Sequence, residues 1–288
     1  MTAPTEPGIY RGVPDEVYHA DRASLSSSAA RRLSEISPWH WKYEQDHPTT
    51  RSKDHFDLGK AVHTLVLGTG APLVDLGVDE IRTNEAKAQR QAEWDAGRVP
   101  LRSKDYRRAR DMAEAVMNNH HAQRLFATGE PELSAWYRDP VSRVMLRARP
   151  DWTHWIDRNA AVLVDVKKST APTPEAFRSS VLDFGYFRQQ PWYQDAWDWF
   201  GIDTEFVFIV VCDVPPHPVY AVRLKQSAVD LGARLNRRAI SLYADCMRSG
   251  IWPHDGDPLH EIDLPSRAYY NTQEKTTDDR YSSQPAAA

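Results

Sequence analysis

Runs of apolar residues in the second half of the chain predict a β-sheet. These runs are short and rich in β-branched and aromatic residues, as is typical of strands. The predicted strands cover residues 130–137, 144–149, 161–167, 205–214 and 219–224. Turn residues lie between the first and second strands and between the fourth and fifth, so each of these pairs is expected to form a hairpin.

Other segments carry apolar residues at helical spacing. The predicted helices cover residues 29–36, 58–67, 112–117, 188–200 and 227–248, and a short one begins within 172–178. Serines at 24–28 offer N-cap hydroxyls to the first helix, and Pro38 follows its end. Strands and helices together predict an α/β fold. We expect a mixed central β-sheet flanked by helices, with N-terminal helical additions.

The same pattern suggests how the chain is divided. We expect a single domain over residues 1–265, with a mainly helical part at 1–130 and a sheet-containing part at 131–265. Residues 266–288 are polar and poor in aliphatic side chains, so we expect them to be disordered.

Composition narrows the class of protein. The chain has 288 residues and a formal charge of −4, which argues against a protein that coats polyanions over its whole surface. Its two cysteines, Cys212 and Cys246, show no metal-ligand spacing and favour a reducing, cytoplasmic setting. We expect no signal peptide and no membrane-spanning segment.

Acidic and basic side chains mark one candidate site. Asp165 and Lys167 are two residues apart on the predicted strand 161–167, so they project from the same face, whereas Val164 and Val166 point the other way. Asp151 follows Pro150 at the end of the strand 144–149. If the two segments are neighbours, two carboxylates and an ammonium meet at one place. The carboxylate oxygens are hard ligands of the kind that suit Mg²⁺. The alternative is a pair of solvated charges at a sheet edge, which is common.

Further candidates lie outside this stretch. His63 lies among apolar residues on the predicted helix 58–67, where a histidine is more often a core residue than a ligand. Gln190 and Gln194 are one helical turn apart and could contact phosphate, metal-bound water or the carboxylates. Glu132 could be a further carboxylate at the site, or an exposed acid on a strand.

Basic residues suggest where DNA could bind. The densest basic cluster consists of Arg98, Arg102, Lys104, Arg107 and Arg108. Such side chains supply the salt-dependent part of DNA affinity. Nearby acids make a mixed-charge surface helix equally compatible with the pattern. Arg31 and Arg32 could also contact phosphate, although a solvated helix face explains them as well.

The order of these motifs resembles a known superfamily. A Pro-Asp pair, an apolar strand and Asp-x-Lys are the signature of the PD-(D/E)xK nucleases. Over most of its length the chain is similar to the RecE branch of phage and prophage recombination exonucleases, which are related to lambda exonuclease. The motifs that carry this likeness are Gly8-Ile-Tyr10, Ser26–Ser28, Leu58–His63, Arg149–Asp151, Asp165–Lys167 and Gln194–Trp197.

The resemblance implies an activity and partners. It implies Mg²⁺-dependent degradation of one strand of linear double-stranded DNA from its 5′ end, with Mn²⁺ as a substitute. Relatives form homo-oligomeric rings on DNA ends and act with a RecT-type single-strand annealing protein. Branches with an iron–sulfur cluster need four cysteines, so no such cluster is expected here.

The resemblance also assigns roles to residues. It implies that Asp151, Asp165 and the carbonyl of Val166 bind the metal, with His63 and Glu132 as further contacts. Lys167 would act in catalysis, together with Gln194 or, as a weaker match, Gln190. Lys168 departs from the usual pattern, but strand alternation sends it to the opposite face. Asp198 stands where an aromatic residue is more usual, so the glutamine motif is incomplete.

Two other functions remain open. One is a RecB-type or single-strand DNA nuclease with the same site. The other is a DNA-end-binding module whose metal site is vestigial, and the presence of Asp151, Asp165 and Lys167 together speaks against it.

Overall fold

The fold is described from a computed structural model, which covers residues 2–48, 58–254, 259, 261–265 and 269. The chain divides into two units, Met1–Trp252 and Pro253–Ala288. The tail predicted to be disordered, residues 266–288, lies outside the described residues except for Tyr269. No helix in the described part of the chain is long and apolar enough to cross a membrane.

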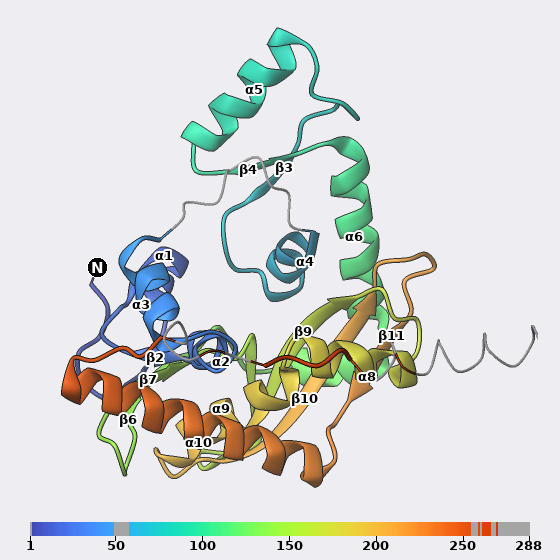
Figure 1. The fold of residues 1–288 in the computed structure, drawn as a ribbon. Helices are drawn as coiled ribbons and strands as arrows, with labels where there is room; N and C mark the ends of the chain where they lie inside the picture. The colour runs from blue at the N-terminus through green and yellow to red at the C-terminus, as the bar shows by residue number, and fades with distance from the viewer. Residues whose placement is uncertain (1, 49–57, 255–258, 260, 266–268, 270–288) are drawn as a thin grey trace, which may run out of the picture. The chain divides into compact units, whose positions relative to one another are not determined.

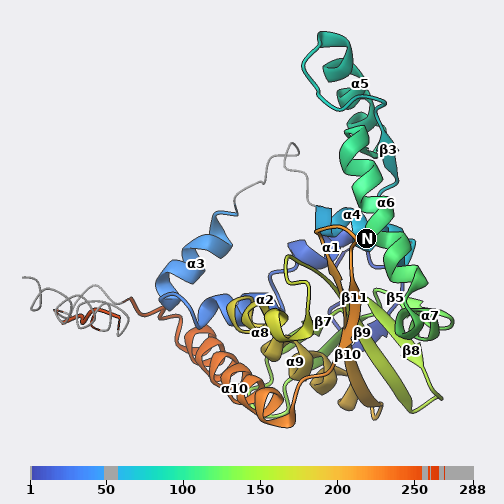
Figure 2. The same ribbon diagram turned by 90° about the vertical axis from the view of Figure 1, so that its right-hand side faces the viewer.

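A mixed five-stranded sheet forms the centre of the first unit (Figures 1 and 2). Its strand order is β11-β10-β9-β8-β5. The strands are β5 (Glu130–Pro131), β8 (Trp152–Trp155), β9 (Ala160–Ser169), β10 (Asp203–Cys212) and β11 (Val219–Val222). β9 and β10 pair in parallel and the other neighbours are antiparallel, as a mixed sheet requires. The prediction of an α/β fold with a mixed sheet flanked by helices is therefore confirmed.

A second sheet of four strands has the order β1-β6-β7-β2. Its strands are β1 (Gly8–Tyr10), β2 (Leu25–Ser26), β6 (Ser134–Arg138) and β7 (Met145–Ala148). The sequence predicted one strand over residues 130–137, but the chain breaks there and divides this segment between the two sheets. Glu132 lies at the break with a φ of 50°, a left-handed conformation that ends the extended run. The expected hairpin survives as β6 and β7.

The helices cover both sheets. In chain order they are α1 (Asp15–Ala20), α2 (Ser27–Leu33), α3 (Pro38–Asp46), α4 (Leu58–Leu67), α5 (Asn84–Asp95), α6 (Ser103–Asn118), α7 (His120–Phe126), α8 (Pro174–Asp183), α9 (Tyr186–Asp198) and α10 (Gln226–Ser249). A short parallel pair, β3 (Leu73–Asp75) and β4 (Val99–Leu101), precedes α6. The predicted helix 112–117 is only the end of α6, which begins at Ser103 and includes most of the basic cluster.

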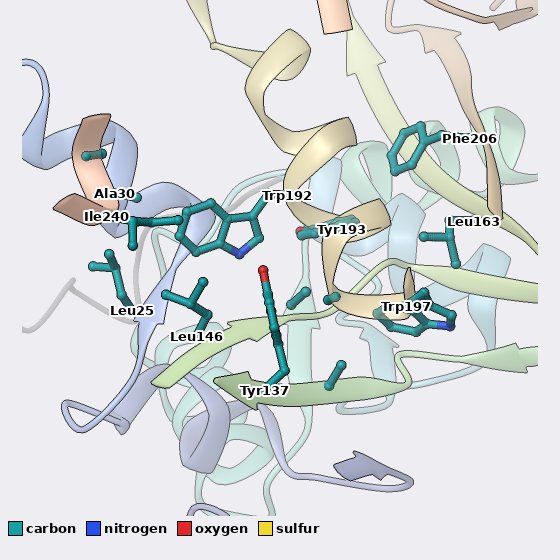
Figure 3. Packing of buried hydrophobic residues seen from close by; sticks show 14 of the residues in the cluster. Leu25, Ala30, Tyr137, Leu146, Leu163, Trp192, Tyr193, Trp197, Phe206 and Ile240 are labelled. Atoms are coloured by element: carbon teal, nitrogen blue, oxygen red, sulfur yellow. The ribbon is translucent and has the colours of Figure 1, made fainter. Parts of the chain in front are cut away.

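Strand alternation separates two apolar cores. On β9, Leu163 packs with residues of α2, α9, α10 and the second sheet, whereas Val162 and Val164 pack with α4 and α6 on the other face. Figure 3 shows the first core, where Trp192 and Tyr193 of α9 lie between Leu146 of β7 and Phe206 of β10. Both faces of β9 are covered along most of the strand, so Asp165 is buried, whereas Lys168 near the end of the strand is exposed.

Helix α9 lies unusually close to α10. A Cβ atom placed on Gly232 of α10 would lie 2.0 Å from the carbonyl oxygen of Phe187. Pro191, four residues after Phe187, has no N–H to donate to that carbonyl, as a helix would otherwise require. Proline and glycine together let the two backbones approach, and this contact fixes which side of α9 faces β9.

Candidate active site

The two predicted acids meet at the pairing of β8 with β9. In this antiparallel pair Trp152 is opposite Val164, so Asp151 arrives beside Asp165. The Val166 N–H donates to Asp151 Oδ2 at 2.6 Å. Lys167 lies two residues beyond Asp165 on the same face, and its ammonium contacts Asp165 Oδ1. The structure thus brings Asp151, Asp165 and Lys167 into one cluster, with the Asp165 side chain 1% exposed and that of Lys167 16%.

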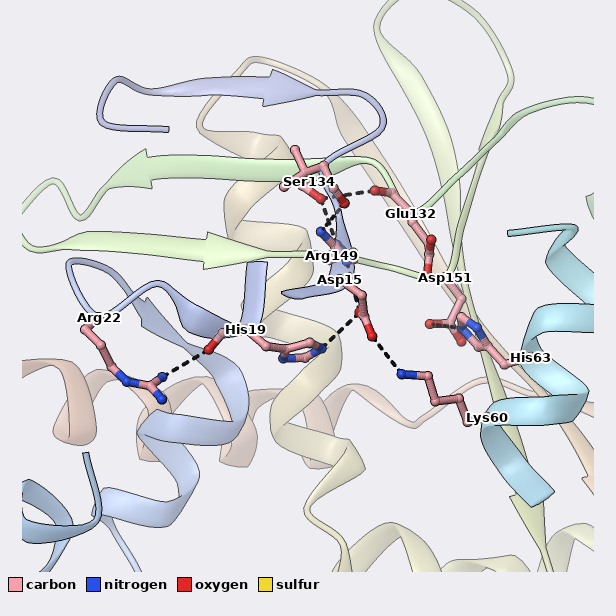
Figure 4. Close-up of polar contacts among 10 residues, drawn as sticks. Asp15, His19, Arg22, Lys60, His63, Glu132, Ser134, Arg149 and Asp151 are labelled. Atoms are coloured by element: carbon pink, nitrogen blue, oxygen red, sulfur yellow. Dashed lines mark hydrogen bonds and ion pairs between the residues drawn. The ribbon is translucent and has the colours of Figure 1, made fainter. Parts of the chain in front are cut away.

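His63 on α4 joins the cluster from the opposite side. Its Nε2 lies 2.8 Å from Asp151 Oδ1 (Figure 4). Burial lowers the pKa of His63, but the carboxylates of Asp151, Glu132 and Asp165 outweigh it and raise the pKa to about 9. The imidazole is therefore a cation at neutral pH and balances one carboxylate, while Lys167 balances the other.

The two acids differ in their environment. Burial raises the pKa of Asp165, the charge of Asp151 raises it further, and it reaches about 6 despite Lys167. Burial also raises the pKa of Asp151, but His63, Lys167 and the Val166 N–H hold it below its ordinary value. Burial lowers the pKa of Lys167, yet both carboxylates raise it above its ordinary value. Of these two acids, Asp165 is thus the one whose negative charge is disfavoured.

Glu132 lies between β5 and β6, at the break described above. Its N–H donates to the Asp151 carbonyl at 3.0 Å, and its carboxylate is near enough to raise the pKa of His63. Figure 4 shows Glu132 beside Asp151 and His63. The structure therefore places Glu132 next to the cluster, on a bend between the sheets and not on the strand that the sequence predicted.

The glutamine at the site is Gln189, which the sequence analysis missed. Gln189 Nε2 donates to Asp165 Oδ2 at 2.6 Å and to the Tyr193 hydroxyl at 2.9 Å. Gln194 instead donates to the Thr204 carbonyl at 2.7 Å, and Gln190 donates to Gln194 at 3.1 Å. Placing Gln194 or Gln190 against the carboxylates was therefore wrong. Spacing in the sequence does not single out Gln189, because Gln189 and Tyr193 are one helical turn apart just as Gln190 and Gln194 are.

The donor atoms suit a hard divalent cation. Asp165 Oδ1 is buried and lies against the Lys167 ammonium. Within the described residues, no three His, Cys, Asp or Glu side chains are arranged as a metal-binding group. Mg²⁺ does not need one, because it usually takes one or two protein carboxylates and completes its octahedron with water and substrate phosphate. Asp151, Asp165 and the Val166 carbonyl therefore fit Mg²⁺.

The predicted DNA-binding cations are mostly ion-paired. Arg98 pairs with Glu93, Arg102 with Asp105 at 2.5 Å, Arg107 with Asp79 at 3.2 Å, Arg31 with Glu35 at 3.1 Å and Arg32 with Glu44 at 2.6 Å. Arg108 donates to the Asp213 carbonyl at 2.8 Å. Lys104 is exposed in the first turn of α6. This pattern matches the mixed-charge alternative more closely than an open basic patch.

Comparisons with known proteins identify the fold and the family. The crystal structure named "Putative exonuclease" from Eubacterium rectale matches with a TM-score of 0.57 at 10% sequence identity, over 90% of this chain and 98% of that one. At that identity the likeness concerns the fold alone. The structure named SSO0001 matches with a TM-score of 0.34 at 10% identity, over 77% of each chain, which is too low to support an argument. No curated protein matches the sequence. Residues 26–260 match the family described as "PDDEXK-like domain of unknown function (DUF3799)", and the chain belongs to that family.

Proposed function

We propose that this protein is a Mg²⁺-dependent nuclease, with Mn²⁺ as a substitute, that degrades linear double-stranded DNA from its ends. The observation that carries the proposal is the buried contact of Lys167 with Asp165, beside Asp151 and His63. Buried acids with separated pKa values and a neighbouring amine are costly to maintain and are typical of catalytic sites. Family membership supports the same class of reaction.

Each residue of the cluster has a proposed role. Asp151, Asp165 and the carbonyl of Val166 would hold the metal, with His63 and Glu132 at its edge. When bound, Mg²⁺ would polarise the phosphate and lower the pKa of a bound water. Lys167 would orient the attacking water and stabilise negative charge on the phosphate oxygens. Gln189 would hold the Asp165 carboxylate in position through its amide.

The finer features of the proposal rest on the resemblance to RecE-type exonucleases. They are 5′ to 3′ polarity, single-stranded tails made for recombination, a ring of copies around DNA and a RecT-type annealing partner in the cytoplasm. Phosphate contacts would come from Lys104 and from arginines that exchange an acid partner for a phosphate. The candidates are Arg98, Arg102, Arg107, Arg108, Arg31 and Arg32, of which one or two, Arg31 among them, would open on binding.

A label-release assay tests the proposal. Linear duplex DNA carrying a label at one 5′ or one 3′ end is incubated with Mg²⁺, beside circular duplex and single-stranded DNA. We expect early loss of the 5′ label and no attack on circles. Preferred digestion of single strands would favour the RecB-type alternative. No release of acid-soluble nucleotides from any substrate would favour a binding module.

Two neighbouring lysines give a matched control. Lys167→Met removes the ammonium that contacts Asp165, and we expect it to abolish release while DNA-end binding persists. Lys168→Met removes an ammonium that contacts Asp213 Oδ2 at 3.0 Å, and we expect it to keep the activity. Equal turnover by the Lys167 variant would refute the proposed role of this residue.

A further inference from the structure

Phe184 is an exposed aromatic residue, and only the ring of Tyr186 lies between it and the active-site Lys167. Phe184, between α8 and α9, is 57% exposed, and its neighbour Leu182 is 68% exposed. The Phe184 ring stacks on Tyr186 with 5.6 Å between ring centroids and an interplanar angle of 28°. The Lys167 ammonium lies 4.6 Å from the centroid of the Tyr186 ring. A continuous stack therefore leads from solvent to the cluster of Asp151, Asp165 and Lys167.

The backbone holds this ring beside a cation. Gly185 adopts a φ of +68°, which a residue with a side chain rarely adopts. A Cβ on Gly185 would lie 2.5 Å from Arg31 Cδ, so a larger residue there would displace the Arg31 side chain. Arg31 donates to the Asp183 carbonyl at 3.4 Å. The turn between α8 and α9 thus presents an aromatic face with an arginine next to it.

This combination suits a nucleotide better than an apolar partner. An aromatic face stacks on any base, and a guanidinium pairs with its phosphate. The acid partner of Arg31, Glu35, is 42% exposed, and surface ion pairs of this kind contribute little, so phosphate can replace it. A base inside a duplex has its faces covered by its neighbours, so only a terminal or unpaired base can stack on Phe184.

From these contacts we propose that Phe184 is a base-stacking platform that holds the terminal or unpaired nucleotide next to the phosphate to be cleaved. This inference rests on the proposed nuclease function and adds a positioning residue to it. Tyr186 would continue the stack inward and keep the Lys167 ammonium against its face. Because stacking does not read hydrogen-bonding edges, the platform would act on all four bases.

The test uses DNA with the fluorescent base 2-aminopurine at its 5′ terminus, with Ca²⁺ in place of Mg²⁺ to slow cleavage. We expect wild-type protein to change the fluorescence through stacking. Phe184→Ala should abolish that change and raise Kd roughly 5- to 100-fold. Phe184→Leu, which keeps apolar bulk without a ring, should behave like Phe184→Ala, and Phe184→Trp should restore the signal.

Trp199 provides the matched control. It is 43% exposed and caps the opposite end of α9, so Trp199→Ala removes a similar ring away from the cluster. We expect this variant to bind and cleave like wild type.

The outcomes separate the two proposals. If wild type releases nucleotides with Mg²⁺ but Phe184→Ala keeps the same Kd and fluorescence change, the platform is refuted and the nuclease function stands. An equal loss in Trp199→Ala would also refute the platform, because the effect would not depend on position. If wild type neither binds nor cleaves DNA, the nuclease function fails and the platform fails with it.

Discussion

The two glutamines Gln189 and Gln194 allow a sharp test, because they lie on one helix and contact different partners. Replacing either by methionine keeps the length of the side chain and removes its amide. Gln189→Met deletes the hydrogen bonds to Asp165 and to the Tyr193 hydroxyl, whereas Gln194→Met deletes the one to the Thr204 carbonyl and the one from the Gln190 amide. Only the first of these changes reaches the active-site carboxylate.

The expected magnitudes follow from these contacts. Each variant leaves a buried polar group without a donor, so each should lose about 1–3 kcal/mol in the free energy of unfolding. A hydrogen bond to a charged group contributes about 1.5–3 kcal/mol. If the Gln189 bond to Asp165 is needed in the transition state, Gln189→Met should lower kcat/KM by roughly 10- to 150-fold. Gln194→Met should keep kcat/KM per folded molecule.

Two measurements on the same preparations check this. Urea denaturation gives the free energy of unfolding, and release of acid-soluble nucleotides with Mg²⁺ gives kcat/KM for the folded fraction. Because both variants should lose a similar free energy of unfolding, a difference in activity between them cannot come from destabilisation of the fold. If Gln194→Met lost activity as strongly as Gln189→Met, or if neither did, the assignment of Gln189 to the site would be wrong.

Three other predictions use different parts of the molecule. Chelation with EDTA should abolish nucleotide release. Mg²⁺ at about 100 times its Kd should add about 2.7 kcal/mol to the free energy of unfolding, which can be measured as a rise in Tm. Burial raises the pKa of Asp139, but Ser142 and Arg237 hold it below its ordinary value. The ionised Asp139 carboxylate therefore stabilises the fold above pH 3.8, and this stabilisation is lost as the pH falls through the lower pKa of the folded state. Acid unfolding followed by circular dichroism should accordingly show a smaller loss of stability with falling pH in Asp139→Asn than in wild type. Gly232→Ala would place a Cβ atom against the Phe187 carbonyl, so it should lower the free energy of unfolding by about 1–3 kcal/mol or more and reduce activity by shifting α9.

Strand and helix periodicity predicted much of the fold. The helix α4 has the predicted bounds, β9 contains the predicted strand 161–167, and β10 contains the predicted strand 205–214 except for its last two residues. Alternation on β9 also predicted that Asp165 and Lys167 share a face, because the period of a strand is two wherever it lies. These features depend on local sequence alone, which is why a single sequence suffices for them.

Features that depend on tertiary contacts were not predictable in this way. Gln189, Gln190 and Gln194 are all polar positions on one helix, and the sequence does not say which of them faces β9. That choice follows from the close approach of α9 to α10 at Gly232, a contact between distant segments. The division of residues 130–137 between two sheets likewise depends on the left-handed backbone at Glu132, for which the residue type gives no signal.

The ion pairs of the predicted DNA-binding residues have a consequence for how binding responds to salt. Six of the seven cations in that set form ion pairs with acidic residues: Arg31, Arg32, Arg98, Arg102, Arg107 and Arg108. Within the described part of the chain the Lys104 ammonium has no acidic partner, although the Lys104 N–H donates to Asp79. Contact of all seven with phosphate would give a slope of about −6 in log K against log salt concentration, whereas Lys104 alone would give about −1. A net charge of −4 and the proposed stacking contact at Phe184 both favour a shallow slope, between −1 and −3. Titration of DNA ends between 50 and 200 mM salt measures it. A slope near −6 would mean that these ion pairs open on binding and that phosphate contacts, not stacking, dominate the affinity.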